Sequence, residues 1–148
     1  MRNVTVERTL TAPRSSVWAV LADYPNIVDW NDGVKNSYAI GDATEGVGAQ
    51  RQCDLVPNGA MRMRETVAEW VPEERMVIAM DKIEVMPVEH ATQTFTLSDS
   101  GEATLFTMSY DYEPLAGIDG SSFDQQSAMG FNGFIDSLEP AAQAQATT

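Results

Sequence analysis

The residue types best suited to chemistry are an arginine and a glutamate, Arg51 and Glu65, in two neighbouring segments of alternating polarity. These segments, residues 48–55 and 61–70, are joined around Pro57-Asn58-Gly59, which predicts a three-residue hairpin loop with its glycine in the left-handed conformation. Residues directly opposite each other share a face of a sheet. The loop therefore sets Arg51 opposite Glu65, on the face that also carries the apolar pairs Leu55–Met61, Cys53–Met63 and Ala49–Val67.

An ion pair on an apolar face has two interpretations. A buried carboxylate beside an arginine stays ionised, and it can accept a proton or orient a hydroxyl or carbonyl group of a substrate. Alternatively, Arg51 and Glu65 only satisfy each other near the rim of the sheet. The pattern favours the second interpretation, but Glu65 and Arg51 remain the one candidate catalytic pair.

Four further residues invite a functional interpretation. Tyr110 and Tyr112 can donate hydrogen bonds to a ligand carbonyl, although such tyrosines more often fill a core with the hydroxyl at its edge. His90 is the single histidine, and its strand phase places it on the outer face among threonines. Cys53 has no histidine neighbour, which favours a buried structural thiol. One histidine and one cysteine do not make a standard zinc site, so neither a metal nor a cofactor is expected.

Composition excludes several classes of protein. The 148 residues are enough for one domain with a substantial core. Lys+Arg number 9 against 22 Asp+Glu, a formal charge of −13, which opposes binding to nucleic acid and to anionic membranes. A single cysteine forms no internal disulfide, and no signal peptide or membrane-spanning stretch is apparent, so we expect a cytoplasmic protein without membrane insertion.

The elements that must position these residues begin with Thr11–Trp30. A first strand over Asn3–Leu10 precedes it, Pro13 suits the first turn of a helix, and Tyr24-Pro25 separates this helix from a second short one. Strands follow from Val34 onward, without crossover helices, which predicts an antiparallel sheet and an α+β fold. A last helix is capped by Ser121 or Ser122, carries Gly130 and Gly133, and ends or kinks at Pro140. The domain should span 1–140, and 141–148 should form a flexible tail.

Two more hairpins set the phase of the later strands. A four-residue loop at Val71–Glu74 pairs Val67 with Ile78 and Glu65 with Met80, and it places Lys82 opposite Met63. A four-residue loop at Ser98–Gly101 pairs Gln93 with Phe106 and Ala91 with Met108. A three-residue loop there would instead pair His90 with Tyr110, and it is the less favoured register.

The order of elements and several residues together resemble the START-like (SRPBCC, Bet v 1-like) superfamily, closest to its polyketide cyclase/dehydrase branch. The resemblance covers nearly the whole chain and rests mostly on structural residues: Ala12, Pro13, Val17, Trp18, Leu21, Asp23, Trp30 and Tyr112-Glu113-Pro114. It implies a helix-grip fold, in which a bent seven-stranded antiparallel sheet wraps around the C-terminal helix. Two short helices would lie between strands one and two.

The resemblance also implies a cavity between sheet and helix, lined by the inner strand faces. Its apolar lining would then be Cys53, Met63, Val67, Ile78, Met80, Phe95, Phe106 and Met108. Its polar members would be Arg51, Glu65, Gln93, Tyr110 and Tyr112. A mostly apolar pocket with a few polar groups suits a small hydrophobic or aromatic ligand, such as a lipid or a polyketide-like compound. The domain would act as a carrier or binding protein, or alternatively as a cyclase, aromatase or dehydratase. Similar proteins often form homodimers, so the resemblance also allows a homodimer.

Overall fold

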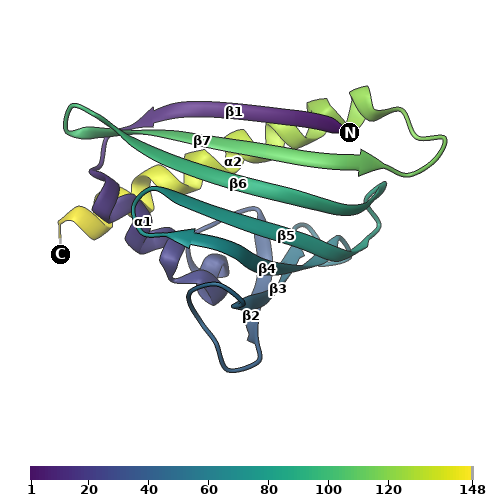
Figure 1. Ribbon diagram of the computed structural model, residues 1–148, viewed down its shortest axis with the longest axis horizontal. Helices are drawn as coiled ribbons and strands as arrows, with labels where there is room; N and C mark the ends of the chain where they lie inside the picture. The colour runs from purple at the N-terminus through teal and green to yellow at the C-terminus, as the bar shows by residue number, and fades with distance from the viewer. Residues whose placement is uncertain (148) are drawn as a thin grey trace.

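The computed structural model describes residues 1–147 and contains one seven-stranded antiparallel sheet with a long helix lying along its concave face (Figure 1). The expected α+β helix-grip fold is confirmed. Within the described residues, no helix is both long enough and apolar enough to cross a membrane. The elements are, in chain order, β1 Arg2–Leu10, α1 Arg14–Ala22, the 3-10 helix η1 Tyr24–Asp29, β2 Val34–Ile40, β3 Gln50–Leu55, β4 Arg62–Val71, β5 Arg75–Glu84, β6 Val88–Ser100, β7 Ala103–Pro114 and α2 Gly120–Ala146.

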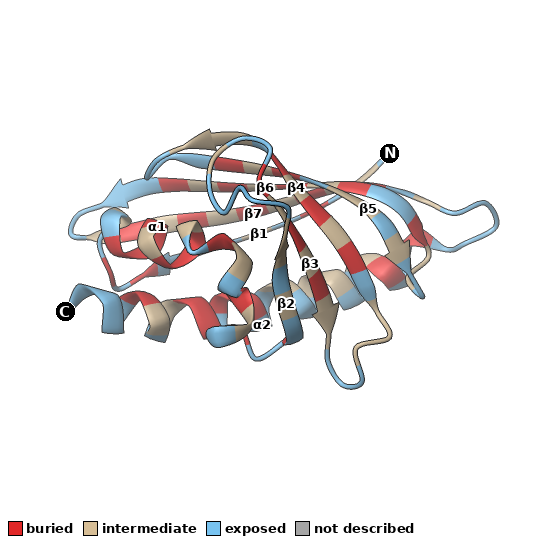
Figure 2. Ribbon diagram, turned by 90° about the horizontal axis from the view of Figure 1, so that it is seen from below, coloured by how far each residue is buried: buried red, intermediate tan, exposed pale blue. Residues whose placement is uncertain are grey.

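The sheet has the strand order β1-β7-β6-β5-β4-β3-β2. From β2 to β7, each strand pairs with the strand that follows it, as successive hairpins do. The first strand instead pairs with β7, so α1 and η1 carry the chain from one edge of the sheet to the other. These two short helices and the C-terminal half of α2 lie together at one end of the sheet (Figure 2).

The predicted β3–β4 register is confirmed, with Arg51 opposite Glu65. The predicted β4–β5 pairs Val67–Ile78 and Glu65–Met80 are also confirmed. The four-residue loop is wrong, because Val71 pairs with Arg75 and the register shifts between Val67 and Glu69. The predicted position of Lys82 is wrong, because the β4–β5 register shifts between Arg62 and Arg64. Lys82 has a φ of 50°, in the left-handed region, and it lies outside the cavity described below.

The predicted register of β6 and β7 is wrong by four residues, because Gln93 pairs with Tyr110 and not with Phe106. Both strands extend further than expected, and Ser100 pairs with Ala103 across a tight turn at Gly101-Glu102. Gly101 has a φ of 64°, which suits a short hairpin turn. Because a shift by an even number of residues keeps each side chain on its face, the predicted inner and outer faces survive the error.

The last helix differs from its prediction at both ends. Asp119 caps it, with its side chain accepting a hydrogen bond from the Ser121 backbone N–H at 3.0 Å, in place of the predicted serine caps. The helix also continues past Pro140 to Ala146, so residues 141–146 are not a tail. Proline leaves the carbonyl four residues earlier without its helical partner. That residue, Asp136, and Pro140 are both exposed to solvent, where water can bind the carbonyl. Thr148 lies outside the described residues.

The N-terminal end of α2 is held to the sheet by polar contacts. Arg2 donates to the Asp124 carboxylate through Nε at 3.1 Å, and the Tyr112 hydroxyl donates to the same carboxylate. These contacts hold the pKa of Asp124 below its ordinary value, chiefly through the hydrogen bond from Arg2. A β-carbon at Gly120 would overlap the end of the Arg2 side chain, so a larger residue there would force that arginine to move away from its place beside Asp124.

The other end of α2 is held by the main apolar core. Ile135, Leu138 and Ala142 of α2 are fully buried in one cluster with Val17 and Leu21 of α1. A second cluster lies near the start of α2, where Tyr112 meets Phe123 with ring centroids 4.9 Å apart. The helix therefore packs against protein at both of its ends, with a less tightly packed stretch between the two clusters.

Candidate functional site

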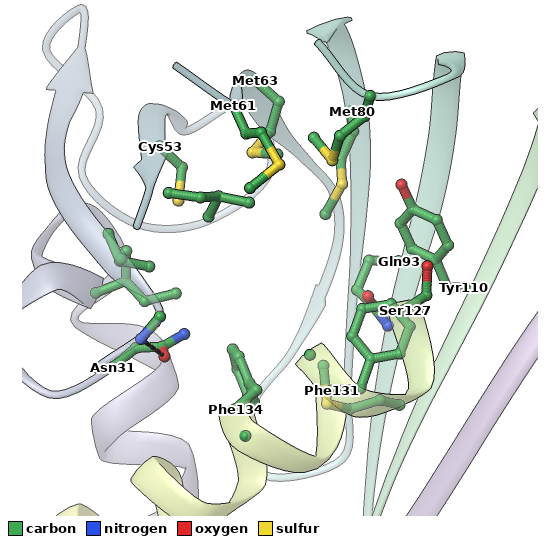
Figure 3. Close-up of a pocket in the computed structure, with 18 of the residues that line it drawn as sticks. Asn31, Cys53, Met61, Met63, Met80, Gln93, Tyr110, Ser127, Phe131 and Phe134 are labelled. Atoms are coloured by element: carbon green, nitrogen blue, oxygen red, sulfur yellow. Dashed lines mark hydrogen bonds between the residues drawn. The ribbon is translucent and has the colours of Figure 1, made fainter. Parts of the chain in front are cut away.

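A cavity of about 770 Å³ lies between the concave face of the sheet and the middle of α2 (Figure 3). Strands β3 to β7 supply one wall, and α2 supplies the opposite one. The loop after η1, the β3–β4 loop and the β5–β6 loop complete its rim. Most of the lining side chains are apolar, and the largest of them are Met61, Met63, Met80, Met86, Met108, Phe95, Phe123, Phe131, Phe134 and Tyr110.

Most of the lining residues expected from strand phase lie in this wall. The ion pair and three more side chains from the faces of β3 to β5 are present: Arg51, Glu65, Cys53, Met63 and Met80. Strands β6 and β7 contribute Gln93, Phe95, Met108 and Tyr110. The alternation of polarity along each strand was therefore enough to identify which face looks inward.

Four expected lining residues do not line the cavity: Val67, Ile78, Phe106 and Tyr112. The first three have the inward phase, but they lie in the main core cluster with α1. Phe106 stacks on Phe134 of α2, with centroids 6.4 Å apart. Tyr112 is fully buried and donates hydrogen bonds to Asp124 and to the Gly120 carbonyl. The helices thus cover both ends of the inner face of the sheet. Only the centre of that face lines the cavity.

Several lining residues were missed by the sequence reasoning because they come from loops and from α2. The rim residues Asn31, Asp32, Val56, Met61 and Met86 belong to irregular segments, which carry no periodic signal. On the helix, Gly130 and Gly133 did give a signal, since small residues leave space. Both line the cavity, and a β-carbon built on either would meet no atom within 4 Å.

The Arg51–Glu65 pair is buried in the wall, with each residue 4% exposed. Arg51 Nε donates to Glu65 Oε1 at 2.9 Å, and another guanidinium N–H donates to the Tyr24 carbonyl at 2.7 Å. The guanidinium carbon lies 4.0 Å from the centroid of the Tyr24 ring, a cation–π contact. The Tyr24 hydroxyl donates in turn to the Glu65 carbonyl at 3.0 Å. The pair therefore joins η1 to β3 and β4.

The pKa values around Arg51 and Glu65 agree with an ion pair in which each charge satisfies the other. Burial disfavours the charge of Arg51, but the charge and hydrogen bond of Glu65, together with smaller contributions from Tyr24 and Cys53, outweigh it, and the pKa of Arg51 is raised. Burial also raises the pKa of the Cys53 thiol, with a further rise from the charge of Glu65. Cys53 is therefore a protonated, unreactive thiol in the cavity wall, as the sequence predicted.

A second polar group on the wall has unused hydrogen-bonding capacity. Gln93, Tyr110 and Ser127 lie close together on one side of the cavity (Figure 3). The Gln93 amide nitrogen donates to the Ser109 carbonyl at 3.0 Å, which leaves the amide oxygen as an acceptor. Among residues 1–147, neither the Tyr110 nor the Ser127 hydroxyl has a hydrogen-bond partner. Burial raises the pKa of Tyr110, so its phenol stays protonated as a donor.

The cavity opens to solvent beside α2. Several of its lining residues are exposed: Val56 and Val85 on two loop tips, and Gln126, Gly130 and Gly133 on one flank of the helix. Buried residues such as Arg51 and Gln93 lie at the opposite wall. A molecule from solution therefore reaches the buried polar groups by passing a rim that combines apolar side chains with Asn31 and Asp32.

Other candidate chemistry finds no support in the geometry. His90 is exposed on β6 and lies outside the cavity, as its outer strand phase predicted. In the part of the chain that the structure describes, no three His, Cys, Asp or Glu side chains gather as a metal ion would require. The polar chemistry of the cavity wall therefore centres on the ion pair and on the Gln93, Tyr110 and Ser127 group.

The bent sheet, the long helix and the cavity between them define a START-like, Bet v 1-like helix-grip domain. The sequence model of the family described as "Polyketide cyclase / dehydrase and lipid transport" matches residues 1–137. The chain belongs to this family, and the expected resemblance is confirmed.

Solved structures share the fold across nearly their full length. A START superfamily protein from Mycobacterium smegmatis has a TM-score of 0.81 at 14% identity, over 96% of this chain and 97% of that chain. The protein Ara h 8.0201 has a TM-score of 0.80 at 9% identity, over 97% and 98%. The protein TTHA0849 from Thermus thermophilus has a TM-score of 0.75 at 21% identity, over 97% and 98%. No curated protein matches the chain in sequence.

The buried ion pair predicts an asymmetric response to mutation. Glu65→Leu leaves Arg51 charged, buried and without its partner, and it should lower the free energy of unfolding by about 3–5 kcal/mol. The double variant Arg51→Met/Glu65→Leu removes both charges and should recover most of that loss. Urea unfolding of the wild type, both single variants and the double variant measures the coupling.

The matched control is the Arg64–Asp81 pair, which joins β4 to β5 on the outer face. Asp81→Leu should cost much less than Glu65→Leu, because water solvates the remaining arginine. Strictly additive losses at Arg51 and Glu65 would contradict a closed, buried ion pair.

Proposed function

We propose that the protein binds a small hydrophobic or aromatic molecule, lipid or polyketide-like, in this cavity and acts as a carrier or binding protein. The observation that supports this most strongly is the cavity itself, about 770 Å³ in volume, lined mainly by apolar side chains and open beside α2. Small-molecule sites are typically concave, mostly apolar and provided with a few fixed polar groups. The family description, which includes lipid transport, agrees with this proposal.

The methionines of the wall suit a ligand of irregular shape. Met61, Met63, Met80, Met86 and Met108 all line the cavity. Methionine is unbranched, with a polarisable sulfur, so it adapts to different apolar surfaces at little cost. A wall of this kind can accept related compounds that differ in outline.

A second candidate is an enzyme of the cyclase, aromatase or dehydratase type, which the family description also names in part. The observation that favours it is the presence of Glu65, Arg51 and Tyr110 in one cavity. Against it, Glu65 and Arg51 already bind each other, and Arg51 also donates to the Tyr24 backbone carbonyl. Tyr110, with its protonated hydroxyl, is the better candidate to polarise a ketone. A cytoplasmic location and a homodimer stay predictions from the sequence.

The carrier proposal predicts that filling the cavity from the helix abolishes ligand uptake. In Gly130→Leu/Gly133→Leu, two leucines enter space that no atom occupies. Helix stability should rise by about 1 kcal/mol for each glycine removed. Uptake of the neutral fluorescent probe N-phenylnaphthylamine should fall at least about tenfold, while the thermal unfolding temperature stays the same or increases.

The control is Gln125→Leu, which adds the same side chain at an exposed helix position outside the cavity. It should leave probe binding unchanged. If the double glycine variant still binds the probe like the wild type, the cavity is not the binding site.

The two candidate functions diverge at Tyr110. Tyr110→Phe keeps the ring, which packs on Phe131 with centroids 5.3 Å apart, and removes only the hydroxyl. A carrier should lose little probe affinity, because the probe offers no carbonyl. An enzyme that polarises a poly-ketone through this hydroxyl should lose turnover by about a hundredfold or more. Product analysis with a poly-ketone substrate distinguishes them, and unchanged turnover in Tyr110→Phe would exclude the hydroxyl as a proton donor.

A further inference from the structure

The charged residues in the cavity wall are one arginine, Arg51, and three acids, Asp32, Glu65 and Asp136. We propose that the cavity selects uncharged ligands, whose polar group is a hydroxyl or a carbonyl, and rejects carboxylates and phosphates. This inference rests on the proposed binding function and adds the chemical class of the ligand. It follows from the state of each charged group and from the polar groups that remain free.

The arginine of the wall is not available to an anion. Arg51 already donates to Glu65 at 2.9 Å and to the Tyr24 carbonyl at 2.7 Å, and its flat face lies over the Tyr24 ring. A ligand carboxylate would have to displace the Glu65 carboxylate, which is 4% exposed and already bound to Arg51. Within the described residues, no other lysine or arginine lines the cavity.

The rim adds negative charge where a ligand must pass. Asp32 is exposed beside the cavity and has no ion-pair partner in the part of the chain that the structure describes. Asp136 is exposed on the α2 flank and is neutralised by Arg8, with 2.6 Å between nitrogen and oxygen. The chain as a whole carries a formal charge of −13. An anion is therefore repelled before it reaches the wall, where Arg51 is already paired.

The polar groups that remain free are neutral. The Tyr110 and Ser127 hydroxyls can donate, and the Gln93 amide oxygen can accept. These three lie together on one side of the cavity (Figure 3). A carbonyl accepts from the hydroxyls, and an alcohol or phenol also donates to the amide oxygen. A carboxylate could accept from the same hydroxyls, but two neutral hydrogen bonds do not replace the hydration of a full charge.

The test compares two compounds with the same chain, 1-decanol and decanoate, as competitors of N-phenylnaphthylamine. At about pH 8 the acid is fully ionised, because carboxyl groups titrate near about 4 to 5. We expect decanol to displace the probe at a concentration at least about tenfold lower than decanoate does. Equal or stronger displacement by decanoate overturns the inference and leaves the binding function intact. Failure of the probe itself to bind overturns the proposed function, and the inference falls with it.

The charge at the rim can be varied without touching the buried wall. Asp32→Lys changes an exposed side chain that makes no ion pair within residues 1–147, so the fold should be unaffected. It should strengthen decanoate binding severalfold relative to decanol binding, because only decanoate carries a charge for the lysine to attract. The matched control Asp42→Lys makes the same change of net charge in the loop between β2 and β3, away from the cavity. Equal effects of both substitutions would show that net charge, and not the rim, controls selection, and would overturn the assignment to this site.

Discussion

The cavity depends on the way in which α2 is held, because contacts anchor both ends of the helix while its middle borders the cavity through Phe131, Phe134 and two glycines. Near its start, Asp124 binds Arg2 and Tyr112, and near its end Leu138 and Ala142 are fully buried against the core. Between these anchors lie Gly130 and Gly133, where an added β-carbon would meet no other part of the protein. Buried contacts at the two ends, together with the stacking of Phe134 on Phe95 and Phe106, hold the helix against the sheet while the cavity stays unfilled.

The buried ion pair is a structural device that also bears on the proposed ligand binding. Arg51, Glu65 and Tyr24 join η1 to the strands, and their mutual contacts use the charges that a catalytic pair would need to have free. A buried arginine stays charged, so its carboxylate partner must stay in place. The same contacts keep Arg51 out of the reach of a ligand. Neutral hydrogen-bonding groups on β6, β7 and α2 then remain to orient what enters.

The inner faces of the strands were predictable because alternation along a strand is a local property. The loop chemistry of Pro57-Asn58-Gly59 also predicted its register correctly, whereas the loop at 71–74 is one residue shorter than predicted and a shift between Val67 and Glu69 restores the predicted Val67–Ile78 pair. The register of the third hairpin failed because Ser98-Asp99-Ser100 is polar like a loop, yet it pairs as strand. Those three residues are exposed at the end of the sheet, so no buried face required apolar side chains there.

What could not be predicted depends on contacts between distant elements. Val67, Ile78 and Phe106 have the correct phase but lie under the helices, and only the packing of α1 and α2 decides that. The loop residues of the rim have no periodic pattern to indicate them. The helix wall was missed except for its glycines, since an apolar stripe does not reveal which of its members contact protein and which face a cavity.

The most direct test of the account observes the cavity wall during binding. Of the 8 methionines, Met61, Met63, Met80, Met86 and Met108 line the cavity, whereas Met1, Met76 and Met129 do not. Met76 is buried in the core and Met129 is exposed on α2, so they serve as internal controls. In an NMR titration of isotope-labelled methionine methyl groups with N-phenylnaphthylamine, the aromatic rings should shift the five wall methyls and leave the other three unchanged. Shifts confined to Met1 or Met129, or none at all under conditions in which the probe binds, would contradict a ligand site between the sheet and α2.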